Sequence, residues 1–309
     1  MGKPRIFTFG ETVLDILFKN DKVFSSMPGG AMLNTAVNLA RLNQEVFLIS
    51  EAGDDLCGGF ILNFLKENRI NTDFFTLHNG EKTSIAIASL DKSNEAFYNF
   101  YTSKGIKKDR EAPNFSANDL LLFGSFYSLR EENRSNIVKI VKAAKEAGAI
   151  VVYDPNIREA HCPLSEQEYS YLLENIAFSD IIRASNEDIM NVFGIKGSLE
   201  VFRQLNELGA KNLFYTFGSI GAWFINEKID FFSPSKPIIP ISSVGAGDTF
   251  NAGILFGIAQ SIEEESSLEN LLAKKALKIM RFAIEMATVV CLSLENYIPE
   301  NFAKKSINF

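Results

Sequence analysis

The sequence has few of the residues that build disulfide frameworks and histidine metal sites. Its three cysteines, Cys57, Cys162 and Cys291, form an odd and widely spaced set that offers neither a disulfide framework nor a CxxC metal pair. Two histidines in 309 residues exclude a multi-histidine metal site. Any chemistry must therefore come from carboxylates, amides, hydroxyls and backbone groups.

Long apolar runs and an excess of positive charge are missing as well. No run approaches the roughly 18 apolar residues of a membrane span, and the first residues, MGKPRIFTFGETVLDI, lack the apolar stretch of a signal peptide. The formal net charge is −7 and the pI is near 5.1, which argues against nucleic acid or an anionic membrane as the main partner. We therefore expect a cytoplasmic protein, in which backbone N–H groups could still hold a phosphorylated ligand.

What the chain does have is a regular alternation of strand-like and helix-like segments. Apolar strand-like runs such as RIFTFG (5–10), LLLFG (120–124) and AIVVYD (149–154) alternate with helical patterns such as 31–43 and 131–147. This rhythm predicts an α/β fold with a mostly parallel sheet and helices on both faces. Residues 12–28 and about 82–102 read as strands without intervening helices, so we expect one domain over 1–309 with a small β lid formed by these two segments.

The stretch SSVGAGDTFNAG (242–253) places an acid directly behind two glycines at the start of a helical pattern. Gly245 and Gly247 allow the backbone to approach a ligand closely, and the N–H groups of residues 245–248 can surround an anion at the positive helix end. Asp248 would repel a phosphate but could accept a proton from a hydroxyl that attacks phosphorus. Taken alone, the motif is explained equally well by a plain helix N-terminus with an acid in its first turn. The P-loop pattern is missing, and no GxGxxG follows the first strand, which argues against a dehydrogenase.

Several motifs together resemble one family. GAGDTFNAG resembles the C-terminal signature of the ribokinase-like (PfkB) carbohydrate kinases, and PGGAMLNTAVNLARL (28–42) resembles their N-terminal signature. GETVLD (10–15), AGDDLCGG (52–59), DPNIR (154–158), ASNED (184–188) and TFGSIGAW (216–223) match in the family's order over nearly the whole chain. The resemblance implies a ribokinase-like, Rossmann-like core, a β lid over a sugar, and transfer of the γ-phosphoryl group of ATP, with Mg²⁺, to a sugar hydroxyl.

The resemblance also implies roles for individual residues. Asp248 would be the catalytic base, and Gly245, Ala246 and Gly247 would form the anion hole. The sugar would be contacted by Asp15, Gly29, Gly30, Asn34 and Arg158. The nucleotide would be contacted by Asn156, Ser185, Thr216, Gly218 and Gly221. Asp188 would act on Mg²⁺ through water, because Ser185 and Asp188 stand where many relatives carry Asn-x-x-Glu.

Each of these positions also has a purely structural explanation. Asp15 could be an exposed edge residue and Asn34 a solvated helix residue, while the glycine pairs could simply form turns. Asn156 and Arg158 could belong to a capped loop, and Ser185 and Asp188 to an ordinary helix N-terminus. The ordered set of motifs favours the functional interpretation over these alternatives.

Two departures from the family pattern limit what the resemblance implies. Relatives carry Asp-Thr before the glycine turn, where the aspartate helps to bind a monovalent cation; Ser242-Ser243 stand here, which argues against activation by K⁺. The final helix lacks the usual glycine-alanine ending, so the adenine contacts cannot be assigned.

The DPNxR and Ser-x-x-Asp motifs look closest to the fructokinase and 2-keto-3-deoxygluconate kinase branch. No arginine directly follows the lid aromatics, which favours a neutral ketohexose, with fructose first. The alternatives are a 2-keto-3-deoxygluconate kinase, a ribokinase, a nucleoside kinase, or a non-catalytic regulator that binds sugar or nucleotide. Unpaired strand edges in the lid predict a lid-to-lid homodimer.

Overall fold

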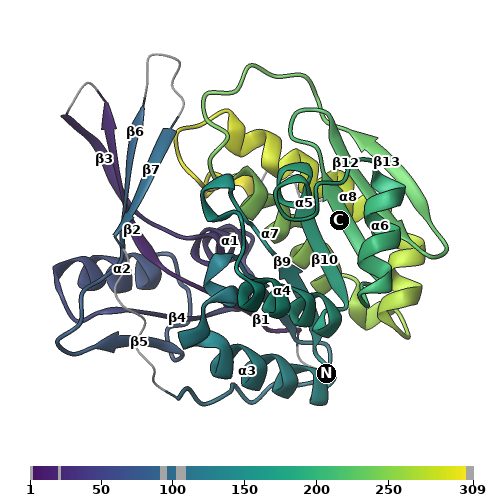
Figure 1. Cartoon of the computed structure of the whole chain (residues 1–309), viewed down its shortest axis with the longest axis horizontal. Helices are drawn as coiled ribbons and strands as arrows, with labels where there is room; N and C mark the ends of the chain where they lie inside the picture. Colours follow the sequence, from purple (N-terminus) through teal and green to yellow (C-terminus); the bar gives the residue numbers. More distant parts are fainter. Residues whose placement is uncertain (1–2, 20–21, 91–95, 102–108, 304–309) are drawn as a thin grey trace.

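The computed structural model describes residues 3–19, 22–90, 96–101 and 109–303 of the chain. Within these residues, a nine-stranded sheet carries helices on both faces and a smaller sheet stands beside it (Figure 1). The order of strands in the large sheet is β13-β12-β11-β10-β9-β8-β1-β4-β5. Its strands are β1 (Ile6–Phe9), β4 (Val46–Gly53), β5 (Phe75–His78), β8 (Leu120–Gly124), β9 (Ile150–Asp154), β10 (Ile181–Ser185), β11 (Asn212–Thr216), β12 (Gly221–Asn226) and β13 (Asp230–Pro234).

The strands from β5 to β11 pair in parallel, and β12 and β13 add an antiparallel edge. Side chains alternate across the sheet, so that Ile6 packs into one hydrophobic core and Phe7 into the other. The first core lies under α1 (Ala31–Arg41), α2 (Leu56–Glu67), α7 (Ala246–Ala259) and α8 (Leu268–Cys291). The second lies under α3 (Arg134–Glu146), α4 (Glu166–Phe178), α5 (Asn186–Phe193) and α6 (Ser198–Glu207). The predicted mostly parallel sheet with helices on both faces is confirmed.

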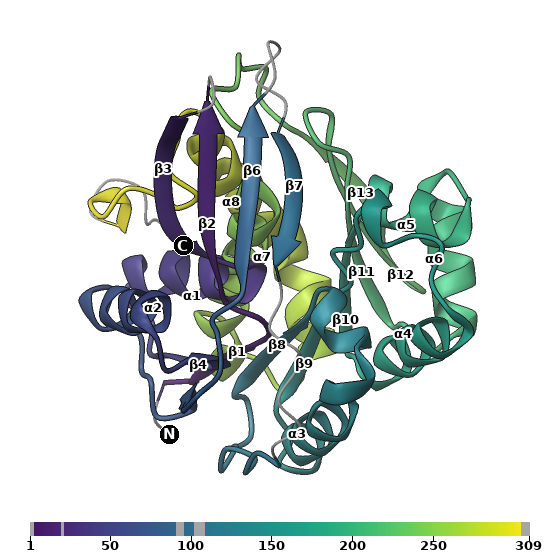
Figure 2. The ribbon, with the colours of Figure 1, turned by 60° about the vertical axis from the view of Figure 1, so that its left-hand side comes forward.

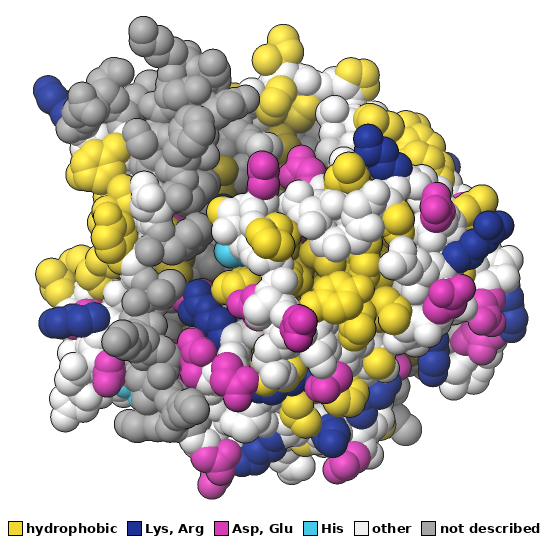
Figure 3. Space-filling view, viewed as in Figure 1, with side chains coloured by type: hydrophobic (Ala, Val, Ile, Leu, Met, Phe, Trp, Pro, Cys, Tyr) yellow, Lys and Arg dark blue, Asp and Glu magenta, His cyan; other side chains and the backbone are white. Residues whose placement is uncertain are grey.

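The smaller sheet, called the lid sheet here, has the order β3-β2-β6-β7 and rises beside α1 (Figure 2). Its strands are β2 (Val13–Lys19), β3 (Lys22–Gly29), β6 (Ile85–Leu90) and β7 (Ala96–Tyr101). Residues 20–21, 91–95 and 102 of the predicted lid segments lie outside the described residues. Hydrophobic side chains gather along the edge of the molecule formed by β3 and α2 (Figure 3), where Val23 is 60% and Phe24 50% exposed.

The lid sheet is joined to the core at the AGDDLCGG motif. Asp55 accepts hydrogen bonds from Gly58 N, Thr83 N and Thr83 Oγ1, at 2.9, 3.0 and 2.6 Å. One carboxylate therefore caps α2 and holds the residue that leads into β6. Gly53 must be a glycine, because a Cβ there would lie 2.5 Å from the carbonyl oxygen of Glu81.

The sequence patterns missed some helices and strands and predicted others to be longer than they are. The helical pattern at 131–147 forms the α-helix α3 only over Arg134–Glu146, and α4, β5 and the antiparallel pair β12–β13 were not predicted. None of the helices formed by the described residues is long and apolar enough to span a bilayer.

Candidate active site

The glycine turn begins α7. Gly245 is the residue before the helix and has φ 79°, a left-handed conformation that favours glycine. A Cβ on Gly245 would lie 2.5 Å from the carbonyl oxygen of Asn296. The N–H group of Ala246 points to the Ser243 carbonyl oxygen at 3.3 Å, which is a long contact. Asp248 follows in the first helical turn and is buried.

Asp248 is held by α1. Asn34 Nδ2 donates to Asp248 Oδ2 at 2.8 Å, and Thr35 Oγ1 donates to the Asp248 carbonyl oxygen at 3.1 Å. Burial raises the pKa of Asp248 to about 6; the Asn34 hydrogen bond opposes the shift and the charge of Asp154 adds to it. A carboxylate with such a pKa can take up and release a proton near neutral pH, as a general base must.

Asp15 and the Gly29–Gly30 pair, which are predicted to contact the sugar, lie close together in the structure. A Cβ on Gly29 would lie 2.0 Å from Asp15 Oδ2, and a Cβ on Gly30, whose φ is 113°, would lie 2.4 Å from the Glu11 carbonyl oxygen. Both positions therefore require glycine. Burial raises the pKa of Asp15 to about 7, while the charge of Arg158 lowers it and that of Asp248 raises it further. The pKa of Asp15 therefore responds to two residues that are distant in the sequence, the exposed Arg158 and the buried Asp248.

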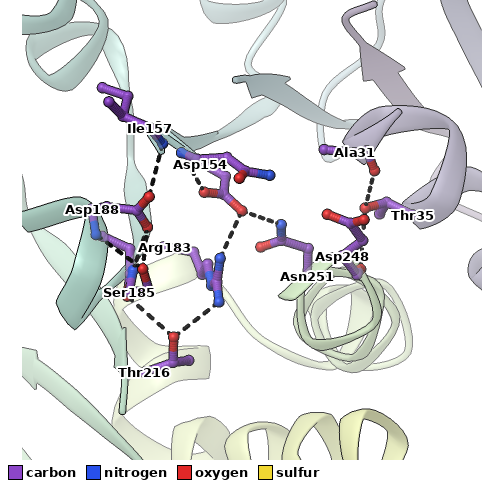
Figure 4. A network of polar contacts seen from close by, with 12 residues as sticks. Ala31, Thr35, Asp154, Ile157, Arg183, Ser185, Asp188, Thr216, Asp248 and Asn251 are labelled. Carbon is purple, nitrogen blue, oxygen red and sulfur yellow. Dashed lines mark hydrogen bonds and ion pairs between the residues drawn. The ribbon is translucent and has the colours of Figure 1, made fainter. Parts of the chain in front are cut away.

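A buried arginine, Arg183, joins Asp154 and Thr216 (Figure 4) and lies close to Gly247 of the glycine turn. Arg183 on β10 is 6% exposed; its Nη1 donates to Asp154 Oδ2 at 3.0 Å and its Nη2 to Thr216 Oγ1 at 2.9 Å. Asn251 Nδ2 donates to the same Asp154 oxygen at 2.6 Å. A Cβ on Gly247 would lie 3.1 Å from both terminal nitrogens of Arg183. The glycine thus lets a positive charge approach the helix N-terminus.

The charge of Arg183 is secured by its neighbours. Burial works against that charge, but Asp154, Asp188 and Asp248 raise the pKa of Arg183 above its already high ordinary value. The guanidinium therefore stays positive next to the predicted anion hole at any pH at which the protein is folded.

Ser185 and Asp188 form a reciprocal cap at the start of α5. Asp188 N donates to Ser185 Oγ at 3.1 Å, while Ser185 N and Oγ both donate to Asp188 Oδ2 at 2.7 Å. Asp188 Oδ1 accepts from Ile157 N at 2.8 Å, and Asn156 N donates to Asp154 Oδ1 at 3.1 Å. The loop after β9 and the end of β10 are therefore locked together, and burial, with the charge of Asp154, raises the pKa of Asp188.

The predicted nucleotide-side residues divide into two groups. Thr216 is buried and engaged by Arg183, so it belongs to the charged network. Gly218, with φ 48°, lies in the turn between β11 and β12, and Gly221, with φ 141°, is the first residue of β12. Beside that turn, the Trp223 ring packs on Phe217 and Phe232, with centroids 4.9 and 4.1 Å away. A Cβ on Gly221 would lie 2.3 Å from the Ser233 carbonyl oxygen, so this glycine has a packing reason as well.

The Asp154 and Asp188 carboxylates are already held by protein donors. Both oxygens of Asp154 and both oxygens of Asp188 already accept hydrogen bonds from protein donors. Among the residues that the structure describes, no three His, Cys, Asp or Glu side chains group as a metal site. Contact of Asp188 with Mg²⁺ through water stays a prediction.

Sequence reasoning missed Arg183 and Asn251. Arg183 is the charged residue within the apolar run IIRAS, and Asn251 follows Asp248 by three residues on the same helix face. Within the described part of the chain, Asn34 Oδ1, Asn251 Oδ1 and Arg183 Nε are buried and have no hydrogen-bond partner. Buried polar atoms normally find partners, so this cluster is suited to a polar ligand.

Comparison with known proteins finds a family match over nearly the whole chain. The sequence profile described as "pfkB family carbohydrate kinase" matches residues 3–300. A fructokinase of Vibrio alginolyticus is 25% identical over 81% of this chain and 83% of its own length. The probable fructokinase-6, chloroplastic, of Arabidopsis thaliana is 29% identical over 88% of this chain and 76% of its own length.

Solved structures share the fold. The fructokinase from Vibrio cholerae O395 in its fructose, ADP and potassium ion bound form has a TM-score of 0.82 at 20% identity and covers 95% of this chain and 94% of its own. The aminoimidazole riboside kinase from Salmonella enterica has a TM-score of 0.83 at 20% identity, over 97% and 99% of the two chains. The chain belongs to the pfkB family of carbohydrate kinases, and it is a sugar phosphotransferase.

Proposed function

We propose that this pfkB-family kinase transfers the γ-phosphoryl group of ATP to a hydroxyl of a neutral ketohexose, with fructose as the first candidate. One observation carries the proposal. Asp248, a buried carboxylate with a pKa of about 6, lies in the first turn of α7, and Arg183 lies against Gly247 of the same turn. A base and an anion-stabilising charge thus meet within a single helical turn.

The proposed reaction uses these groups in sequence. Asp248 accepts the proton of the attacking sugar hydroxyl as that oxygen bonds to phosphorus, and the bond from phosphorus to the ADP oxygen breaks. The N–H groups of residues 245–248, supported by the charge of Arg183, stabilise the phosphoryl oxygens. Asn34 binds a sugar hydroxyl, because its buried Oδ1 has no donor. The half-buried Asp15 carboxyl group, beside Gly29, pairs with another sugar hydroxyl.

The nucleotide side is proposed from the remaining predicted residues. Asn156, Ser185, Gly218 and Gly221 would contact ATP, with Thr216 acting through Arg183. The relatives' structures with bound ADP or ATP support a nucleotide here, and one of them holds a potassium ion. Ser242 and Ser243 still argue against a potassium requirement in this chain.

Fructose is favoured by the relatives' names and by the absence of an arginine directly after the lid aromatics. Arg158 favours a second candidate, 2-keto-3-deoxygluconate, because its charge acts on both Asp15 and Asp248 and could pair with a sugar carboxylate. We also propose a homodimer through the lid sheet, whose β3 edge exposes Val23 and Phe24.

The test is ATP consumption by the purified protein against fructose, tagatose, ribose, 2-keto-3-deoxygluconate and adenosine, with Mg²⁺ and with or without K⁺. We expect the highest kcat/KM with fructose. Asp248→Asn should lower kcat by about 10²–10⁴-fold, the usual contribution of a general base, and should leave fructose binding intact. Asp230→Asn, at an exposed strand position, is the matched control.

Two outcomes would overturn parts of this proposal. Preference for 2-keto-3-deoxygluconate, lost in Arg158→Gln, would replace fructose with an acid sugar. Binding of fructose without any ATP consumption would make the protein a non-catalytic regulator.

A further inference from the structure

The chain that follows α8 passes between the parts of the proposed site. The backbone of Asn296 packs against Gly245, where a Cβ would lie 2.5 Å from the Asn296 carbonyl oxygen. Tyr297 Oη donates to the carbonyl oxygen of Pro28 at 2.7 Å, and Ile298 N donates to Asn38 Oδ1 at 2.9 Å. Residues 296–298, called the C-terminal strap here, are buried.

The Pro28 carbonyl group lies at the base of the lid sheet. Pro28 pairs with Leu14 and Gly29 with Val13 at the end of β3, directly before the backbone turns at Gly30. Gly29 in turn lies against the Asp15 carboxylate. A hydrogen bond that fixes the Pro28 carbonyl group therefore fixes the surface on which Asp15 and the glycine pair would receive the sugar.

The Tyr297 side chain is itself fixed from two sides. Its ring lies 5.8 Å from the ring of Phe64 on α2, and the Arg41 guanidinium lies 5.2 Å from its centroid. The ring therefore has little freedom to rotate away, and its hydroxyl group is presented to Pro28 from the core.

The same strap reaches the helix that holds the base. Asn38 accepts the hydrogen bond from Ile298 N through its Oδ1. Its Nδ2 donates to the Asn34 carbonyl oxygen at 2.9 Å and to Thr249 Oγ1 at 3.0 Å. Thr249 is the neighbour of Asp248. One short segment thus touches the lid base, α1 and the start of α7.

We propose that Tyr297 is a positioning residue for phosphoryl transfer, and that the C-terminal strap couples the Gly245 turn to the Gly29–Gly30 turn. The kinetic part of this inference rests on the proposed sugar kinase function. Nucleotide that orders the glycine turn of α7 then also orders the base of the lid sheet, and so favours sugar binding. Linkage requires that bound sugar favours nucleotide binding by the same factor.

Tyr297→Phe removes one hydroxyl group and keeps the ring, so it tests the coupling without a cavity. We expect the KM for fructose at saturating ATP to rise about 3- to 10-fold, the effect of one net hydrogen bond. The KM for ATP at saturating fructose should rise by a similar factor, as linkage requires, while kcat changes less than about twofold. Tyr171→Phe is the matched control, because Tyr171 is also buried and donates its hydroxyl hydrogen to Glu131, between α4 and the segment before α3.

Hydrogen exchange tests the coupling without turnover. ADP should slow exchange in a peptide covering residues 22–33 of the wild type and of Tyr171→Phe, and this slowing should disappear in Tyr297→Phe. If Tyr297→Phe keeps both the fructose KM and the ADP-dependent protection, the coupling is wrong. If Tyr297→Phe raises both KM values, lowers kcat by a similar factor and lowers the unfolding midpoint, Tyr297 is merely structural and the proposal fails.

The two proposals can fail separately. If the wild type phosphorylates no sugar, the proposed function fails, yet ADP-dependent protection of residues 22–33 still decides whether the strap couples the two turns.

Discussion

The candidate site has two halves, and each holds a buried aspartate in a different way. On the first side, where α1 meets α7, Asp248 receives a neutral amide from Asn34. On the second side, where β9 and β10 end, Asp154 receives the guanidinium of Arg183 and the amide of Asn251. Asn251 lies between the two carboxylates in Figure 4.

The different hydrogen-bond partners fit the different roles proposed for the two carboxylates. A neutral donor leaves burial as the main influence on Asp248, so its pKa rises to about 6 and the group can exchange a proton. The Arg183 guanidinium at 3.0 Å and the Asn251 amide hold the Asp154 carboxylate in place, which makes it a fixed support. In the proposed mechanism, similar burial thus serves proton transfer at Asp248 and placement of the Arg183 charge at Asp154.

The largest effect is expected from breaking the second side. Arg183→Met leaves Asp154 buried without its cation, which should lower the free energy of unfolding by about 3–5 kcal/mol. Sugar phosphorylation by the folded fraction should fall by about 10²-fold, because a charge behind the glycine turn is lost. Chemical denaturation and single-turnover kinetics measure the two effects.

Arg183→Lys sharpens this test. Lysine keeps the charge but cannot bond Asp154 and Thr216 in the same forked geometry, so its losses should be smaller than those of Arg183→Met. Equal stability of the wild type and Arg183→Met would show that the buried pair contributes nothing.

The first side should make activity and stability move in opposite directions with pH. Asp248 and Asp15 have pKa values of about 6 and about 7 in the folded protein, above the value of 3.8 that is normal for aspartate. Activity that needs both carboxylates ionised should therefore rise as pH increases through 6–7. The native state binds more protons than the unfolded state between about pH 4 and 7, so this stability is present at low pH and lost as pH rises.

Asp15→Asn separates the two contributions. In the pH profile of kcat/KM, the step near pH 7 that reflects Asp15 should disappear, and the step near pH 6 that reflects Asp248 should remain. At pH 8 the variant should unfold about 2–4 °C above the wild type, and this gain should vanish at pH 4. A gain that is the same at both pH values would mean that burial of the Asp15 charge is not its cause.

The smallest effect is expected at Ser185, whose cap stabilises the second side. Ser185→Ala should cost about 1 kcal/mol, the usual effect of an N-cap, and should raise the KM for ATP about 2- to 5-fold if Ser185 also contacts nucleotide. Ser165→Ala is the control, because Ser165 and Glu168 form the same reciprocal cap at α4. A higher KM for ATP in both variants would trace the effect to the cap rather than to nucleotide contact.

The sequence predicted the fold and the glycine turn of α7 better than it predicted the residues packed around that turn. Continuous apolar runs such as LLLFG predict strands covered on both faces, and β8 is buried along its whole length. GAGD predicted the helix N-terminus at α7 because glycine and aspartate act locally there. Local residue chemistry is visible in a sequence without knowledge of contacts.

Residues whose role depends on distant partners could not be assigned in the same way. An arginine within IIRAS indicates an unusual strand, but only the structure shows Asp154, Thr216 and Gly247 around it. Tyr297 reaches Pro28 across 269 positions of the chain, and no spacing rule covers such a separation.

The position of Trp223 has an optical consequence. It is the single tryptophan of the chain, and it packs between Phe217 and Phe232 beside the turn between β11 and β12. Intrinsic fluorescence excited at the indole band therefore reports from this hairpin alone, while the lid sheet contributes no indole signal. The unlabelled protein carries its own emission probe at one end of the large sheet.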